Sequence, residues 1–78
     1  MLTSYIREAM RLAEYEKLED NTYYGEIPGF DGVWSNAQSL DACREELQSA
    51  LEDWLLLGLR MKHELPVVAG INLTMAEA

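Results

Sequence analysis

The sequence predicts a small α+β domain: a short N-terminal helix, a three-stranded antiparallel meander, one long amphipathic helix packed on the sheet, and a short C-terminal strand. Two observations carry this prediction. Short segments rich in strand-forming residues lie between residues 13 and 37, with turn-forming residues between them. From residue 40 onward, apolar side chains recur every three or four positions for about six turns of helix.

The N-terminal helix is expected over residues 2–13, where apolar positions follow helical spacing with charged residues between them. Thr3 or Ser4 is a suitable cap for its first turn. An irregular arm is the alternative, because two turns of helix are marginal without packing. Residues 1–12 are therefore assigned to a helical extension of a core that spans residues 13–68.

The meander is expected from three segments separated by turns. Residues 13–20 and 22–27 form a predicted hairpin, because Asn21 between them tolerates the left-handed backbone that such turns require. Pro28 ends the second strand, since proline has no N–H to donate to a sheet. A third strand is expected over residues 33–37, where the side chains alternate in the two-residue period of a strand.

The long helix is expected over residues 40–63, with Ser39 as its N-cap. Its predicted apolar stripe comprises Leu40, Cys43, Leu47, Ala50, Trp54, Leu57 and Met61. Packing on its own sheet explains this stripe, and a coiled-coil seam is the alternative because the spacing is close to a heptad. After Pro66, residues 67–71 are expected to add a short fourth strand, and residues 74–78 to form a flexible tail.

Length and composition predict one domain, over residues 1–78, that assembles with other chains. A core this small supplies little stability, and the single cysteine allows no intramolecular disulfide. With 49% apolar residues in 78, we expect a homo-oligomer, either a dimer or a tetramer. No segment approaches the roughly 20 apolar residues of a membrane span, and no signal peptide begins the chain, so a cytoplasmic protein that does not enter membranes is expected.

Charge narrows the class of partner. Fourteen acidic residues against six basic ones give a formal net charge of −8. Affinity for nucleic acid depends on basic residues at phosphates, so direct binding of DNA or RNA is not expected. A basic protein is the natural complement of this charge, and simple solubility is the alternative explanation.

Residues that carry chemistry are sparse, so we expect neither an enzyme nor a cofactor. His63 is the only histidine and has no nucleophile placed beside it by the sequence. Cys43 falls on the apolar stripe and is expected to be buried. Glu14, Glu16 and Glu26 lie on predicted strands and can approach one another, as a metal-dependent nuclease would require. A solvated acidic face explains them as well, so no metal site is predicted.

Aromatic residues are the better guide to a binding surface. Four of them lie on the predicted strands, and Trp54 lies on the long helix. We expect Trp34 and Trp54 to meet in the core, while other aromatics remain on the sheet face or edge that the long helix leaves uncovered. Such surfaces are typical of protein interfaces. The predicted partner-binding or oligomer surface comprises Tyr15, Tyr23, Tyr24, Glu14, Glu16 and Glu26.

Residues 23–43, YYGEIPGFDGVWSNAQSLDAC, resemble the HicB antitoxin family. HicB-like proteins show an acidic turn, a Tyr-led strand ending in Val-Pro, a Pro-Gly turn, a third strand, and a Thr- or Ser-capped helix rich in Leu and Ala. Here Asp20 belongs to the acidic turn, Ile27 precedes the proline and Ser39 is the cap. The resemblance runs from about residue 13 to 68 and rests on order and spacing.

Four departures limit what the resemblance implies. Asp31 stands where the family usually has proline, and Ala37 where it often has glycine. The N-terminal helical segment is additional. Many HicB proteins carry a helix-turn-helix or ribbon-helix-helix segment after this domain, and this sequence shows none, so regulation of an operon is not implied.

The resemblance implies a β-β-β-α-β domain, described as a partial RNase H fold without that enzyme's catalytic set. It also implies dimers or tetramers that bind a HicA toxin, a small basic RNA-cleaving protein with a double-stranded-RNA-binding-like fold whose active site HicB blocks. The net charge of −8 suits such a partner. A solitary oligomeric module with another protein partner is the alternative, and a metal-dependent nuclease is a third hypothesis.

Overall fold

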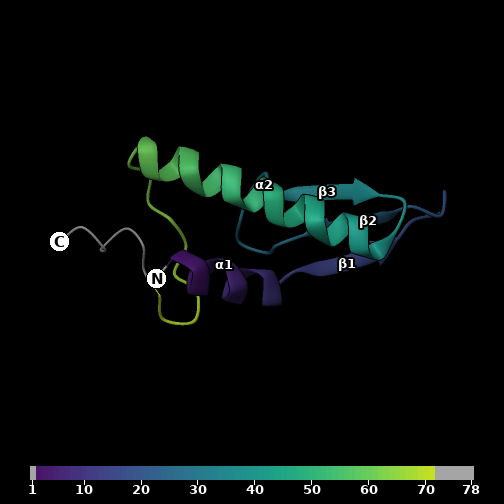
Figure 1. Ribbon diagram of the computed structural model, residues 1–78, viewed down its shortest axis with the longest axis horizontal. Helices are drawn as coiled ribbons and strands as arrows, with labels where there is room; N and C mark the ends of the chain where they lie inside the picture. Colours follow the sequence, from purple (N-terminus) through teal and green to yellow (C-terminus); the bar gives the residue numbers. More distant parts are fainter. Residues whose placement is uncertain (1, 72–78) are drawn as a thin grey trace.

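The computed structural model describes residues 2–71 and confirms the predicted α+β class. Figure 1 shows α2 crossing the three-stranded sheet and extending past it over α1. In chain order the elements are α1 (Leu2–Arg11), β1 (Glu14–Lys17), β2 (Tyr23–Glu26), β3 (Trp34–Ala37) and α2 (Leu40–Arg60).

The sheet is an antiparallel meander in the order β1-β2-β3. The predicted turn between its first two strands forms at Asn21, whose φ of 67° is left-handed. The Asp20 carboxylate accepts hydrogen bonds from the backbone N–H and the hydroxyl of Thr22, at 3.0 and 2.6 Å. These bonds lower the pKa of Asp20, because they favour the charged carboxylate. This local network fixes the register of the hairpin.

Both ends of α2 are closed by hydrogen bonds. The Ser39 hydroxyl accepts from the backbone N–H of Ala42 at 3.1 Å, as expected of an N-cap. The helix was expected to reach residue 63, but it ends at Arg60 because Lys62 adopts a left-handed φ of 59°. The N–H of His63 then donates to the carbonyl of Gly58 at 2.8 Å, which is the long bond of a Schellman motif.

The buried line of α2 differs from the predicted stripe. Leu51 and Leu55 are buried, while Leu40, Leu57 and Met61 are exposed. The predicted stripe keeps a near-heptad spacing, whereas the buried residues advance mainly in steps of four: Cys43, Leu47, Leu51, Leu55 and Gly58. Because α2 packs on the sheet with its first half and on α1 further along, the buried line turns around the helix axis.

The apolar core lies between α1, α2, the β2–β3 loop and the segment that follows α2. Tyr5 of α1, Phe30 of the β2–β3 loop and Leu51 of α2 are among its buried members. The prediction that Trp34 and Trp54 meet in this core is wrong. Trp54 packs on Phe30, with ring centroids 5.2 Å apart, whereas Trp34 is 55% exposed on the sheet. Strand alternation alone left the facing side of Trp34 undetermined.

The C-terminal segment contributes a two-residue bridge to the described structure. Val68 and Ile71 pair across Ala69 and Gly70, whose φ values of 49° and 78° are both left-handed. This turn folds the predicted strand 67–71 back on itself, so it adds no strand to the sheet within residues 2–71. Val68 still joins the core, and the Tyr5 hydroxyl donates to the Pro66 carbonyl, which ties the segment to α1.

Two further features of the chain concern the C-terminal tail and membrane-spanning helices. The tail predicted for residues 74–78 lies outside the described residues. Within residues 2–71, no helix is long and apolar enough to cross a membrane.

Candidate functional site on the open face of the sheet

The two faces of the sheet carry different residues because side chains alternate along each strand. On the helix-facing side, Tyr15, Gly25 and Ser35 lie opposite one another across the three strands. A Cβ atom at Gly25 would stand 3.1 Å from the sulfur of Cys43 in α2, which identifies this as the side that α2 covers. The other side, called the open face here, presents Glu14, Glu16, Tyr24, Glu26, Trp34 and Asn36.

Three carboxylates gather on the open face. Glu14 lies directly opposite Glu26 in the register, and Glu16 lies opposite Tyr24. All three glutamates are exposed, and together with Tyr24 and Tyr15 they line a shallow hollow of about 170 Å³. Like charges placed opposite each other on neighbouring strands destabilise a sheet. The register therefore concentrates negative charge on this part of the open face.

An aromatic pair adjoins the carboxylates. The rings of Tyr24 and Trp34 stack with centroids 6.1 Å apart and an interplanar angle of 23°. The Tyr24 hydroxyl donates to the Glu26 carboxylate at 3.0 Å, and this bond raises the pKa of Tyr24 because it holds the phenol proton. A second hollow, of about 190 Å³, lies beside this pair against the β2–β3 loop. The face thus combines charge with exposed aromatic surface, and aromatic side chains are enriched at protein interfaces.

Hydrogen bonds to α2 and between neighbouring strands hold β2 and β3 in place. The Ser35 hydroxyl, on the helix-facing side of β3, donates to the carbonyl of Cys43 at 2.8 Å. On β3 itself, the Asn36 amide donates to the Tyr23 carbonyl at 2.9 Å and to the Thr22 hydroxyl at 3.0 Å. Fixed strands present the open face in one arrangement, which reduces the entropy lost on binding.

The structure separates the six residues predicted to form the binding surface. It brings Glu14, Glu16, Glu26 and Tyr24 together on the open face. Tyr23 lies on the opposite side of the sheet. Tyr15 belongs to that side in the register, although it also borders the hollow that the three glutamates line. Tyr15, on the edge strand β1, is 36% exposed. Its pKa is raised because partial burial disfavours the phenolate, and the nearby charge of Arg44 offsets part of this effect. Tyr23 is half-buried, with the Lys17 ammonium 6.0 Å from its ring centroid.

Trp34 and Asn36 were missed as members of the open face. The signal that locates them is the register, because Trp34 lies opposite Glu26 and Asn36 lies opposite Tyr24. Residues at every second position therefore share the face with the acidic residues of β1 and β2.

Groups with catalytic potential are scattered over the described chain. Within residues 2–71, no set of three or more His, Cys, Asp or Glu side chains is arranged to hold a metal ion. Cys43 is buried, as expected, beside Ser35. His63 is exposed beyond the end of α2. The open face itself is a charged and aromatic surface.

Comparisons with known proteins cover almost the whole described chain. A family profile described as UPF0150-like matches residues 4–66. Among solved structures, the crystal structure of the protein TTHA0281 from Thermus thermophilus is similar to this chain, with 45% sequence identity and a TM-score of 0.86. That match covers 92% of this chain and 90% of the Thermus chain. No curated protein matches the sequence.

Proposed function

Because this chain belongs to the UPF0150-like family, a small antitoxin-like family related to HicB, we propose that it is a HicB-like antitoxin. In this proposal it binds and neutralises a small basic, RNA-cleaving toxin of the HicA type, and it acts by binding and not by catalysis. The observation that carries the proposal is the grouping of Glu14, Glu16 and Glu26 around Tyr24 on the open face.

The chemistry of the two surfaces supports this pairing. A toxin that holds RNA needs a basic surface. An antitoxin that blocks the same surface must offer carboxylates in place of phosphates and an apolar contact in place of bases. The open face provides both, since the stacked Tyr24 and Trp34 lie directly beside Glu26. With a net charge of −8, the whole chain also steers a cationic partner toward itself.

The test is binding to the small basic protein encoded beside this chain's gene. The open-face variant Glu14→Gln/Glu16→Gln/Glu26→Gln removes the three charges with little change in shape. At about 1 kcal/mol for each charge, the dissociation constant measured by titration calorimetry should rise about a hundredfold. Inhibition of RNA cleavage by the toxin should weaken in parallel.

A matched control separates the local arrangement from total charge. Glu19→Gln/Glu45→Gln/Glu64→Gln removes the same number of charges from exposed positions outside the open face. If binding depends on the open face, this control retains affinity within about threefold of wild type. Equal losses in the two variants would show that only net charge matters. Absence of any small basic neighbour would instead favour the alternative of a module with another protein partner.

A further inference from the structure

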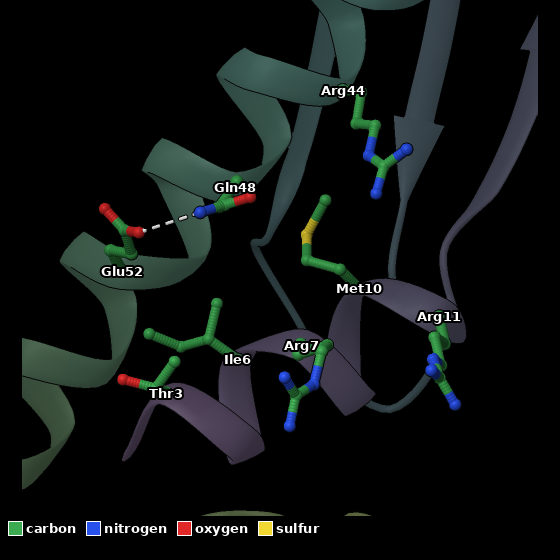
Figure 2. A pocket seen from close by; sticks show the side chains of 8 residues that line it. All are labelled: Thr3, Ile6, Arg7, Met10, Arg11, Arg44, Gln48 and Glu52. Carbon is green, nitrogen blue, oxygen red and sulfur yellow. Dashed lines mark hydrogen bonds between the residues drawn. The ribbon is translucent and has the colours of Figure 1, made fainter.

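Positive charge gathers around a cavity between α1 and α2. Figure 2 shows side chains of the two helices facing each other across this space of about 460 Å³. Arg7, Arg11 and Arg44 line it, and they are three of the six basic residues in the chain. Ile6 and Met10 provide an apolar lining. We call this space the arginine cavity, and its volume is in the range of small-molecule sites.

The directions of the two helices explain how the arginines come together. Arg7 and Arg11 are four residues apart and therefore lie on the same face of α1. Because α1 and α2 run in opposite directions (Figure 1), Arg11 lies toward Arg44, and Thr3 lies toward Glu52 (Figure 2). Arg44 and Glu52 are about two turns apart on α2. The cavity is therefore polarised, with guanidinium groups toward one end and a carboxylate at the other.

The guanidinium groups of this cavity are only partly neutralised by the chain itself. Arg11 lies 3.5 Å from the Glu8 carboxylate. Arg7 and Arg44 are exposed, and neither forms an ion pair within residues 2–71. Two unpaired positive charges on facing walls match an anion that carries two negative charges.

We propose that the arginine cavity binds a small phosphate monoester whose organic part is apolar. At neutral pH such a phosphate carries close to two negative charges. Arg7 and Arg44 hold it from the two walls, because guanidinium groups form paired N–H···O bonds with phosphate oxygens. The organic part then lies over Ile6 and Met10, which Figure 2 places beside the arginines.

The acidic end of the cavity determines how the ligand is oriented. The Glu52 carboxylate, which accepts a hydrogen bond from Gln48 at 3.1 Å, repels a phosphate. The phosphate is therefore held toward Arg44, and the organic part extends over Ile6, which is only half-buried. A bare anion leaves this apolar lining uncovered, and a neutral apolar molecule leaves the guanidinium groups unpaired. Both parts of the ligand therefore contribute to binding.

The test uses phenyl phosphate at pH 7.5 and the full chain labelled at its methionine methyl groups. The NMR signal of the Met10 methyl should shift and saturate with a dissociation constant of about 1 mM. The signal of Met61, exposed at the end of α2, should not move. Inorganic phosphate lacks the ring and benzoate lacks the second charge, so each should bind at least about fivefold more weakly. Absence of a saturable Met10 shift up to about 20 mM phenyl phosphate, or equal binding of inorganic phosphate, would overturn the proposal.

A pair of charge variants tests the role of the arginines. Arg7→Gln/Arg44→Gln should raise the dissociation constant of phenyl phosphate at least about tenfold. The control Arg60→Gln/Lys62→Gln removes the same two charges at the end of α2 and should bind within about twofold of wild type. Circular dichroism verifies that each variant is folded. Equal affinity of the Arg7/Arg44 variant and wild type would contradict the site, and because no toxin takes part, the result is independent of the proposed function.

Discussion

The helix-facing side and the open face of the sheet are built from alternating residues of the same short strands, yet they differ in side-chain size and in charge. On the helix-facing side, the residues that pack against α2, Gly25, Ser35 and Ala37, are small and buried, whereas Tyr15 and Tyr23 on the same side are larger and more exposed. Tyr24 and Glu26, the immediate neighbours of Gly25, point to the open face. Small residues on one side permit a close approach of the helix, and large polar residues on the other remain available to a partner.

This difference teaches that stability and recognition are separated at adjacent positions of one strand. A substitution on the helix-facing side changes packing against α2, whereas the same type of substitution one residue away changes the exposed surface. Variants of β2 and β3 can therefore be designed to affect one property and spare the other. Three predictions, from the largest expected effect to the smallest, test this separation.

The largest effect is expected at Gly25. A Cβ atom there would lie 2.9 Å from the Tyr15 ring and 3.1 Å from the Cys43 sulfur, so the branched side chain in Gly25→Val must displace α2 or the edge of the sheet. Overpacking of this kind lowers the free energy of unfolding by about 2–3 kcal/mol. Urea denaturation measures the loss. Glu26→Val, the outward neighbour, should change stability by less than about 0.5 kcal/mol, and equal losses would contradict the separation of the two faces.

A smaller effect is expected at Ser35. Ser35→Ala removes the buried hydroxyl that donates to the Cys43 carbonyl, with a loss of about 1 kcal/mol in the free energy of unfolding. The same truncation at the exposed Ser49 of α2 should lie within about 0.5 kcal/mol of wild type. Parallel thermal melts compare the two variants. If Ser35→Ala left the melting temperature unchanged, the hydrogen bond from Ser35 to Cys43 would not stabilise the packing of α2 on β3.

The smallest effect concerns the titration of Tyr24 on the open face. Its pKa is raised above the ordinary 10.0, mainly because its hydroxyl donates to Glu26, and the nearby carboxylates add to the shift. A raised pKa in the folded state favours folding below about pH 10 and loses this contribution as the pH rises through the folded value. In Glu26→Gln, ring-carbon NMR should show the Tyr24 pKa moving toward its ordinary value. The pKa of Tyr5, raised by burial, should not move.

The sequence predicted those parts of the fold that depend on local chemistry. The turn at Asn21 requires a residue that tolerates a left-handed φ, and the start of α2 requires a cap such as Ser39, so both were found from residue type alone. Glu14, Glu16 and Glu26 were expected to approach one another because they lie on predicted strands, and the register brings all three onto one face. The two-residue period of a strand is enough to predict which side chains of β1 and β2 share a face, because the turn at Asn21 fixes how these two strands pair.

The remaining features depend on tertiary packing, which the sequence pattern does not determine. Leu57 satisfied the near-heptad spacing and Leu51 did not, yet Leu51 is the buried residue because of the position of α1 against α2. Trp34 had the size of a core residue, and its exposure follows from a register that the long β2–β3 loop leaves open. The cavity between α1 and α2 combines residues from both helices, so no single segment of the sequence contained its pattern.

The burial of Cys43 has a kinetic consequence. It is the only cysteine in the chain, and its side chain is fully enclosed between α2 and the sheet beside Ser35. A thiol reagent in solution reaches this sulfur only when α2 transiently separates from β3 or when the whole domain unfolds. The labelling rate of Cys43 therefore reports how often the contact between α2 and β3 opens under native conditions. A partner bound across the open face should lower this rate only if it stabilises the strands on which α2 packs.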